Sequence, residues 1–277
     1  MSSLQNPRVL EARKLRRRAG RDAAGAYLLE GTVPVCEALR RGAPVRYVFA
    51  SIEHPDGAAI AARAEEAGVS FVPATPGVVE AVSDAATPQG VVAVVDMTDV
   101  PLGEMDGGVD LVLVLDQVRD PGNAGTLVRC ATAAGAGAVV FTKGSVDAYA
   151  PKTVRASAGF LSRVDLVRDA GVDETAELLR GRGFSVVGTD AVAPVPYDAI
   201  DYTGPTAFVV GNEAWGIPAD HRGALTDVVA IPMPGDAESL NAGIAGALLL
   251  FEAVRQRRGR HGSAEGGGDN PFGGTAD

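Results

Sequence analysis

Short, nearly continuous apolar runs alternate with helix-length segments along most of this chain. The second half holds six such runs, around LVLVL, AVVF, DLV, SVV, AFVV and VVAI. A strand that is apolar throughout is typical of a parallel sheet whose two faces are both covered by helices. The alternation therefore predicts an α/β fold, with a doubly wound parallel sheet in the second half.

The first half repeats this pattern on a smaller scale. Apolar, strand-like segments at residues 26–31, 45–51, 69–74 and 90–97 are separated by helical patterns, which predicts the order β-α-β-α-β-α-β. A basic helix is expected before them, over residues 7–18. The first half is therefore expected to form an α/β unit of its own.

A polar, glycine-rich stretch separates the two patterns. Its sequence, TDVPLGEMDGGV, is typical of a linker, and a chain of 277 residues has room for two apolar cores. The last segment, GRHGSAEGGGDNPFGGTAD, lacks apolar periodicity and is expected to be disordered. We therefore divide the chain into a first domain (1–97), a linker (98–109), a second domain (110–258) and a tail (259–277).

The charge of the chain is unevenly distributed. The formal net charge is −10, but residues 1–46 carry ten basic and four acidic side chains, a net charge of +6. Because phosphates bind Lys and Arg, this basic end can meet a polyanion, although a solvated helix face explains the charge equally well. The chain has no apolar stretch of about 18 residues and no signal peptide, which predicts a cytoplasmic protein without a membrane span.

Three polar segments follow apolar runs in the second half. DQVRDPGNAGTLVRC, VGNEAWGIP and IPMPGDAESLNAG each begin where a predicted strand ends. Because ligands bind beyond the carboxyl ends of parallel strands, the three segments are expected to meet at one edge of the sheet. Helices are expected to begin near Asn123, Pro151, Asp173, Pro218 and Ser239.

Familiar cofactor and catalytic motifs do not account for these segments. GAGAVV at residues 135–140 lacks the third glycine of a dinucleotide-binding loop, and no G-x-x-x-x-G-K-[ST] phosphate loop is present. His54, His221 and His261 lack the spacing of a metal site or a catalytic triad, so they are expected at the surface. The sequence predicts no metal site.

The three segments resemble the motifs of the SpoU (TrmH-like) family of RNA 2′-O-ribose methyltransferases in the SPOUT superfamily. The patterns N-A-G-x-x-x-R-x-A, G-N-E-x-x-G-I and I-P-M-x-G-x-x-E-S-L-N occur in the family's order. The first domain resembles the substrate-binding domain of ribosomal protein L30e type that the family appends. The resemblance implies S-adenosylmethionine as cofactor, a deep trefoil knot in the C-terminal domain, and a homodimer.

The resemblance also assigns roles to single residues. It implies that the cofactor is held in a bent form, largely by backbone groups, at Thr189, Gly211, Ile231 and Leu240. Arg129 matches the residue that the family assigns to the ribose hydroxyl. Two roles are open for it, general base or a group that orients ribose and phosphate, since a guanidinium is effectively always protonated.

Four further polar residues of the motifs are expected to support this chemistry. Asn123, Ser239 and Asn241 each stand at a predicted helix start, where a simple N-cap is the alternative role. Glu213 is expected to fix the first motif or the last helix, and an ordinary exposed carboxylate is the alternative. With Arg129, these four residues complete the catalytic set that the resemblance implies.

Several basic residues are candidates for contact with RNA. They are Arg16, Arg17, Arg18, Lys152 and Arg155. The long N-terminal extension resembles members that modify ribosomal RNA, so 23S ribosomal RNA is the preferred substrate and tRNA the alternative. Two other functions are compatible with the sequence, a non-catalytic RNA-binding protein and a nucleotide-dependent oxidoreductase.

Overall fold

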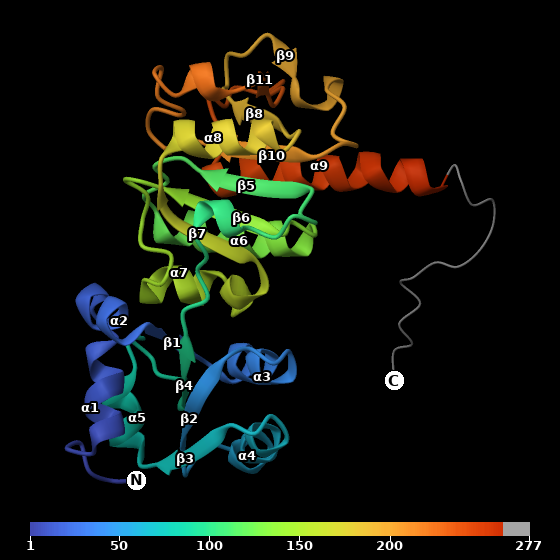
Figure 1. Ribbon diagram of the computed structural model, residues 1–277. Helices are drawn as coiled ribbons and strands as arrows, with labels where there is room; N and C mark the ends of the chain where they lie inside the picture. Colours follow the sequence, from blue (N-terminus) through green and yellow to red (C-terminus); the bar gives the residue numbers. More distant parts are fainter. Residues whose placement is uncertain (263–277) are drawn as a thin grey trace.

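The computed structural model describes residues 1–262 and contains two sheets (Figure 1). The first sheet has four strands in the order β1-β4-β2-β3. β4 is antiparallel to β1 and β2, whereas β2 and β3 are parallel. Its elements are α1 (Pro7–Lys14), α2 (Arg18–Ala24), β1 (Ala26–Glu30), α3 (Thr32–Arg40), β2 (Val45–Ser51), α4 (Gly57–Glu66), β3 (Ser70–Ala74), α5 (Pro76–Val82) and β4 (Val91–Asp96).

Helices cover both faces of this first sheet (Figure 1). Alternate residues of β4 face opposite layers, as the pleat of a strand requires. Ala93 and Val95 belong to a core shared with α3 and α4, whereas Val92 and Val94 pack with α1 and α5. The predicted order of strands and helices in the first half agrees with these elements.

The basic N-terminal segment forms two helices instead of the single helix expected over residues 7–18. α1 ends at Lys14, and α2 begins at Arg18. The turn between them brings Gly20 against the carbonyl oxygen of Lys14, where an added Cβ would lie only 2.1 Å away. Glycine is needed at this approach, but no Gly or Pro stands between the two helices to mark the break in the sequence.

The second sheet has seven strands in the order β7-β6-β5-β10-β8-β11-β9. Every pairing in it is parallel, which confirms the predicted α/β fold with a parallel sheet. The six predicted runs form all its strands except the two-residue β9. The strands are β5 (Leu111–Leu115), β6 (Ala138–Thr142), β7 (Asp165–Ala170), β8 (Ser185–Thr189), β9 (Val195–Pro196), β10 (Thr206–Val210) and β11 (Asp227–Ala230).

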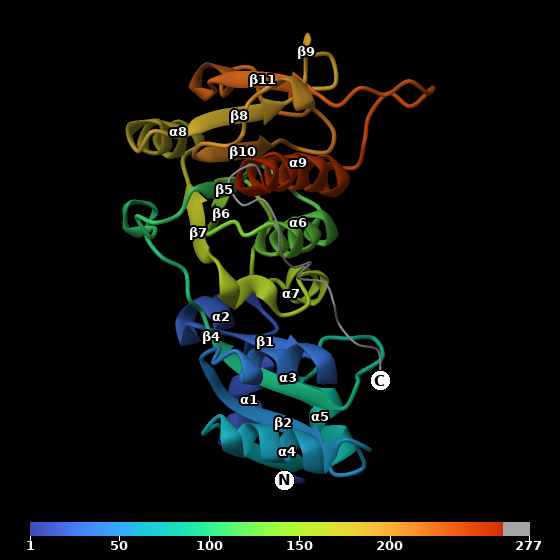
Figure 2. The same cartoon turned by 90° about the vertical axis from the view of Figure 1, so that its right-hand side faces the viewer.

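The helices of the second half lie on both faces of this sheet (Figure 2). Leu113 of β5 belongs to the core that includes Leu127 of α6 and Leu249 of α9, whereas the neighbouring Val114 packs in the core of Leu179 of α8. The helices are α6 (Pro121–Ala133), α7 (Pro151–Ala156), α8 (Val172–Gly181) and α9 (Ala242–Gly262). Short 3-10 turns are η1 (Leu102–Glu104), η2 (Phe160–Arg163), η3 (Tyr197–Ala199) and η4 (Arg222–Ala224).

Two predicted helix starts are wrong. The segment that begins at Pro218 contains only the short turn η4, and α9 begins at Ala242 instead of Ser239. At its other end α9 reaches Gly262, so its last residues are helical where the tail 259–277 was expected to be disordered. The remainder of that tail lies outside the described residues.

The segment 98–109 is attached to the second sheet along its course. The backbone N–H of Val100 donates to the carbonyl oxygen of Leu166 at 2.9 Å, and Met105 is buried in the core on the α8 side. Its polar composition gave no sign of this packing. The position of the linker stays a prediction.

The two sheets meet through charged and aromatic side chains. Arg21 of α2 is buried, pairs with Asp147, and donates to the carbonyl oxygen of Leu15 at 3.0 Å. Beside this pair the rings of Tyr27 and Tyr149 lie 4.9 Å apart. These contacts fix the first sheet below α7 (Figure 1).

Candidate active site

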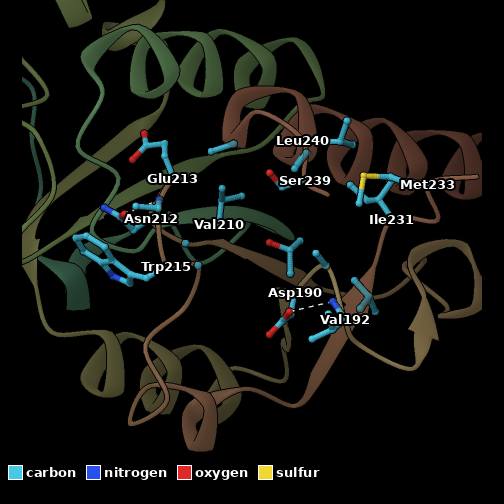
Figure 3. A pocket seen from close by; sticks show the side chains of 18 of the residues that line it. Asp190, Val192, Val210, Asn212, Glu213, Trp215, Ile231, Met233, Ser239 and Leu240 are labelled. Carbon is cyan, nitrogen blue, oxygen red and sulfur yellow. Dashed lines mark hydrogen bonds between the residues drawn. The ribbon is translucent and has the colours of Figure 1, made fainter. Parts of the chain in front are cut away.

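A pocket of about 420 Å³ lies at the carboxyl ends of β8, β10 and β11. Thr189, Gly211, Ile231 and Leu240, the four residues expected to hold the cofactor, all line it. In Figure 3, Leu240 and Ile231 stand on one side of the pocket and Glu213 on the other. The volume is within the range of small-molecule sites, roughly 300–1,000 Å³.

A tight turn at the end of β10 forms one wall of this pocket. Asn212 and Gly216 exchange backbone hydrogen bonds of 3.0 and 2.9 Å, and the side-chain amide of Asn212 donates to the carbonyl oxygen of Gln117 at 2.7 Å. A Cβ on Gly211 would lie 2.4 Å from the carbonyl carbon of Gly216. Only glycine permits this close approach within the turn. The hydrogen bond from Asn212 to Gln117 holds the turn against the segment that follows β5.

Three of the expected catalytic residues form one hydrogen-bonded chain. Asn241 donates from Nδ2 to Oδ1 of Asn123 at 2.8 Å, and Asn123 donates from Nδ2 to Oε1 of Glu213 at 3.0 Å. Glu213 also accepts the backbone N–H groups of Arg119 and Asp120, each at 3.2 Å. The chain thereby joins the third, first and second motifs.

These hydrogen bonds determine the ionisation of Glu213. Partial burial would raise the pKa of this carboxyl, but the hydrogen bonds from the Asn123 side chain and from the backbone outweigh it and lower the pKa below its ordinary value. Glu213 is therefore a firmly ionised acceptor at neutral pH. A carboxylate that only accepts can hold the two loops together but has no proton to give.

Of Asn123, Asn241 and Ser239, each of which could have been a helix N-cap, only Asn241 caps a helix. Asp120, and not Asn123, caps α6, because its Oδ1 accepts the N–H of Asn123 at 2.8 Å. Asn241 caps α9, since its Oδ1 accepts the N–H of Ile244 at 3.2 Å while its Nδ2 binds Asn123. Ser239 precedes the helix, is exposed, and lines the pocket.

Arg129 lies on α6, exposed, and outside the lining of the pocket. Within residues 1–262 it has no ion-pair partner, unlike most of the arginines in the first half of the chain. An exposed, unpaired guanidinium can bind a phosphate without first giving up a carboxylate. Its role stays a prediction.

The basic residues expected to contact RNA are mostly paired with carboxylates. Arg16 and Arg155 both reach Asp84, at 3.4 and 3.7 Å, and Arg18 pairs with Asp169 at 3.3 Å. Lys152 lies 3.8 Å from Asp120, next to the first motif, whereas Arg155 points toward the first sheet. Arg17 is exposed without an ion-pair partner among the described residues. The contact of these residues with RNA stays a prediction.

Two charged residues of the pocket were not identified from the sequence. Asp190 and Arg222 form an ion pair, and both line the pocket (Figure 3 labels Asp190). Asp190 directly follows Thr189 at the end of β8, so its place beyond a strand end was a signal that could have found it. Arg222 belongs to η4, where a regular helix was expected.

His221 is not the free surface residue expected from the sequence. Its Nδ1 lies 2.7 Å from Oδ2 of the fully buried Asp116, and Thr142 donates to Oδ1 of the same carboxylate at 3.1 Å. His54 is also bonded, with Nε2 3.1 Å from the Thr32 hydroxyl. Nδ1 of His54 also accepts the backbone N–H of Asp56 at 3.1 Å, so both histidines are held by hydrogen bonds within the fold.

Among the described residues, no group of His, Cys, Asp and Glu could hold a metal ion. None of the helices formed by these residues is long and apolar enough to cross a membrane.

The sequence and the fold both match a known family. A model of the SpoU rRNA Methylase family matches residues 110–251, and a model of the MRM3-like substrate binding domain matches residues 6–93. The chain belongs to the SpoU rRNA methylase family, the class that its parallel sheet and its three motifs define.

Named relatives span nearly the whole chain. It is 31% identical to the 23S rRNA (guanosine(2553)-2′-O)-methyltransferase RlmP of Bacillus subtilis, over 91% of this chain and 97% of that protein. It is 32% identical to the 23S rRNA (uridine(2479)-2′-O)-methyltransferase of Streptomyces viridochromogenes, over 86% and 85%. The AdoMet-bound rRNA methyltransferase of Sinorhizobium meliloti superposes with a TM-score of 0.80 at 31% identity, over 92% and 97%.

Family membership confirms three expectations from the sequence. They are the SpoU fold with its N-terminal substrate-binding domain, S-adenosylmethionine as cofactor, and methylation of an RNA ribose 2′-hydroxyl as the activity. The homodimer, the knot, the cellular location and the role of each site residue stay predictions.

Proposed function

We propose that this chain methylates a ribose 2′-hydroxyl of 23S ribosomal RNA, with S-adenosylmethionine bound in the pocket at the ends of β8, β10 and β11. The observation that carries the proposal is the convergence of the three motifs. Thr189, Gly211, Ile231 and Leu240 line the pocket. The hydrogen bonds from Asn241 to Asn123 and from Asn123 to Glu213 hold the loops of the three motifs together.

The residues present fit the chemistry of the cofactor. Val210, Ile231 and Leu240 offer apolar surface for the adenine ring, while Asp190 and Arg222 offer charges of both signs for an amino-acid group. S-adenosylmethionine, when bound, supplies a methyl group on a positively charged sulfur.

We propose that Arg129 binds the phosphate and ribose of the target nucleotide and orients the 2′-hydroxyl. Its guanidinium is exposed and unpaired within the described residues, and an Arg–phosphate pair is strong and directional. Holding two reactants in line can supply about 7–11 kcal/mol of a reaction barrier. The Asn241–Asn123–Glu213 chain positions the start of α6, the helix that carries Arg129.

The relatives support ribosomal RNA over tRNA as the substrate. The proteins from Bacillus subtilis and Streptomyces viridochromogenes are both named for 23S rRNA, and each aligns with more than four fifths of this chain. The match of residues 6–93 to a substrate-binding domain supports the division of the chain near residues 98–109. A ribosomal RNA substrate is consistent with the predicted cytoplasmic location.

We also propose that the chain forms a homodimer through α9, with the knot that the family implies. Ile244, Leu248 and Phe251 are 51%, 37% and 48% exposed, and their spacing places them on one side of the helix. Contiguous apolar side chains on a helix surface mark a protein interface. The opposite side of α9 packs on α6, the helix that carries Arg129.

Label transfer tests the proposed activity. Ribosomal RNA from a strain lacking the gene is incubated with the protein and tritiated S-adenosylmethionine, and the labelled nucleotide is mapped by its resistance to alkaline cleavage. We expect label at a 2′-oxygen in 23S rRNA from the deletion strain and little label in rRNA from the parent strain. Label in tRNA alone would reject the substrate, and absence of label from folded protein would reject the activity.

A further inference from the structure

Trp215, the only tryptophan of the chain, is half exposed at the edge of the pocket. Most other aromatic side chains of the described residues are buried, and Phe251 of the α9 stripe is the other exposed one. Trp215 belongs to the second motif and contributes to none of the hydrogen bonds described above. Its exposure therefore needs an explanation of its own.

The backbone around Trp215 is held rigidly. The turn is closed by the paired hydrogen bonds of Asn212 and Gly216, and the N–H of Ala214 donates to Oδ1 of Asn212 at 2.8 Å. Glu213, directly before Ala214, accepts two backbone N–H groups of the first motif. A braced loop thus presents the indole ring to solvent, and the exposure does not come from a loose segment.

Arg119 covers part of the ring. Its guanidinium carbon lies 4.9 Å from the centre of the indole, within the range of a cation–π contact. Arg119 has no ion-pair partner in the part of the chain that the structure describes, so its charge remains available to a phosphate. An aromatic face beside an uncompensated guanidinium is the chemistry that binds unpaired nucleotides, by base stacking and phosphate contact.

Proteins that recognise a particular site in RNA mostly bind loops, bulges and ends, whose unpaired bases can be splayed out and stacked on aromatic side chains. A nucleotide of such a segment held at the pocket, or its neighbour, needs a stacking partner outside the RNA. Trp215 borders the pocket in which the methyl donor is proposed to bind (Figure 3).

We propose that Trp215 and Arg119 form a stacking site for an unpaired RNA base next to the methyl-transfer pocket. The inference rests on the proposed function, since it names how that substrate is held. Trp215 acts by binding substrate, and the reacting atoms do not touch it. The stacking is sequence-tolerant, because every base presents a π face.

Substitutions that separate aromaticity from size test this site. Trp215→Leu keeps an apolar side chain but removes the π face, whereas Trp215→Phe keeps an aromatic ring. Base stacking on an aromatic side chain corresponds to a roughly 5- to 100-fold change in affinity. We expect Trp215→Leu to raise the KM for 23S rRNA by about this factor and Trp215→Phe to raise it much less. The affinity for S-adenosylmethionine, measured by calorimetry, should stay within about twofold of the unsubstituted protein.

The fluorescence of the single tryptophan reports on the same site without turnover. With S-adenosylhomocysteine saturating, a short single-stranded RNA should quench the emission, whereas inorganic polyphosphate, which has charge but no bases, should not. Quenching in protein that fails to methylate rRNA would reject the proposed activity and still support the stacking site.

Three results would overturn the inference. An unchanged KM for RNA in Trp215→Leu would show that the ring binds no base. A loss of S-adenosylmethionine affinity with an unchanged KM for RNA would assign the ring to the adenine of the cofactor. A change from dimer to monomer in Trp215→Leu, measured by light scattering, would assign it to a subunit contact.

Discussion

Asn241 donates a hydrogen bond of 2.8 Å to Asn123, although the two residues are 118 positions apart in the sequence. Asn123 passes the connection on to Glu213 with its own amide. Each asparagine uses its carbonyl oxygen to accept and its amide to donate, and Asn241 also caps α9. The start of the last helix, the start of α6 and the turn after β10 are therefore fixed by a single row of side chains.

The middle of this row gives the first prediction. Asn123→Ala leaves the amide of Asn241 without its acceptor and removes a donor from Glu213. Losing such bonds is expected to destabilise the fold by about 1–3 kcal/mol. Each kcal/mol lowers the Tm by about 2–4 °C in a chain of this size, which calorimetry can measure. Ala133→Ser, at an exposed position on the same helix, is the matched control. An equal Tm for both variants would show that the hydrogen bonds of Asn123 do not stabilise the fold.

A second prediction concerns acid stability. A carboxyl whose pKa is lower in the folded chain stabilises the fold above its unfolded pKa, and this contribution is lost as the pH falls through the folded pKa. Because the pKa of Glu213 is lowered from 4.5, the stability difference between the natural chain and Glu213→Gln should be full at neutral pH and should shrink below about pH 4.5. Denaturant unfolding at a series of pH values measures it. A difference that does not vary with pH would contradict the ionised role of Glu213.

A third prediction concerns the junction of the two sheets. The side chains of Arg21 and Asp147 are only 4% and 12% exposed, so removing one charge leaves the other buried and unpaired. Asp147→Asn should destabilise the fold by about 3–5 kcal/mol. Asp169→Asn breaks an exposed pair with Arg18 and should cost less than about 1 kcal/mol. Similar effects of the two variants in denaturant unfolding would show that the buried pair does not hold the junction.

A fourth prediction tests the proposed dimer. The double variant Ile244→Lys, Leu248→Lys places two charges in the exposed stripe of α9. Dimer formation through this stripe would have to bury both charges against the second subunit. The double variant should be a folded monomer by light scattering and circular dichroism. Val33→Lys changes an even more exposed apolar residue on α3 and should remain a dimer. A dimeric double variant would place the interface elsewhere.

The sequence was sufficient to predict where the pocket lies, but not which residues of the three motifs are hydrogen-bonded to one another. Apolar runs reveal where parallel strands end, and this is why the three polar segments could be expected at one edge of the sheet. The choice of Thr189, Gly211 and Ile231, which do line the pocket, came from the resemblance to the family. The partners of Asn123 depend on β10 lying beside β5, and strand order leaves no trace in apolar periodicity. The sequence offered a cap only as the alternative role of Asn123, and it did not show that Asp120 is the residue that caps α6.

Charge along the chain was also an incomplete guide. Arg16 and Arg18 belong to the basic N-terminal segment, but in the folded chain they pair with Asp84 and Asp169, the second of which lies in the other half of the chain. A count of charges cannot show such tertiary pairing. The unpaired guanidinium of Arg119, beside Trp215, became apparent only from the structure.

In the proposed function, the three motifs bind S-adenosylmethionine while Arg129 binds the ribose and phosphate of the RNA. Arg129→Ala tests it most directly, with cofactor affinity measured by calorimetry and methyl transfer to 23S rRNA from a strain lacking the gene measured on the same protein. We expect the affinity to stay within about threefold and the transfer to fall by about a thousandfold or more, since the lost positioning acts on the transition state. Unchanged transfer, or loss of cofactor binding in a folded variant, would contradict the account.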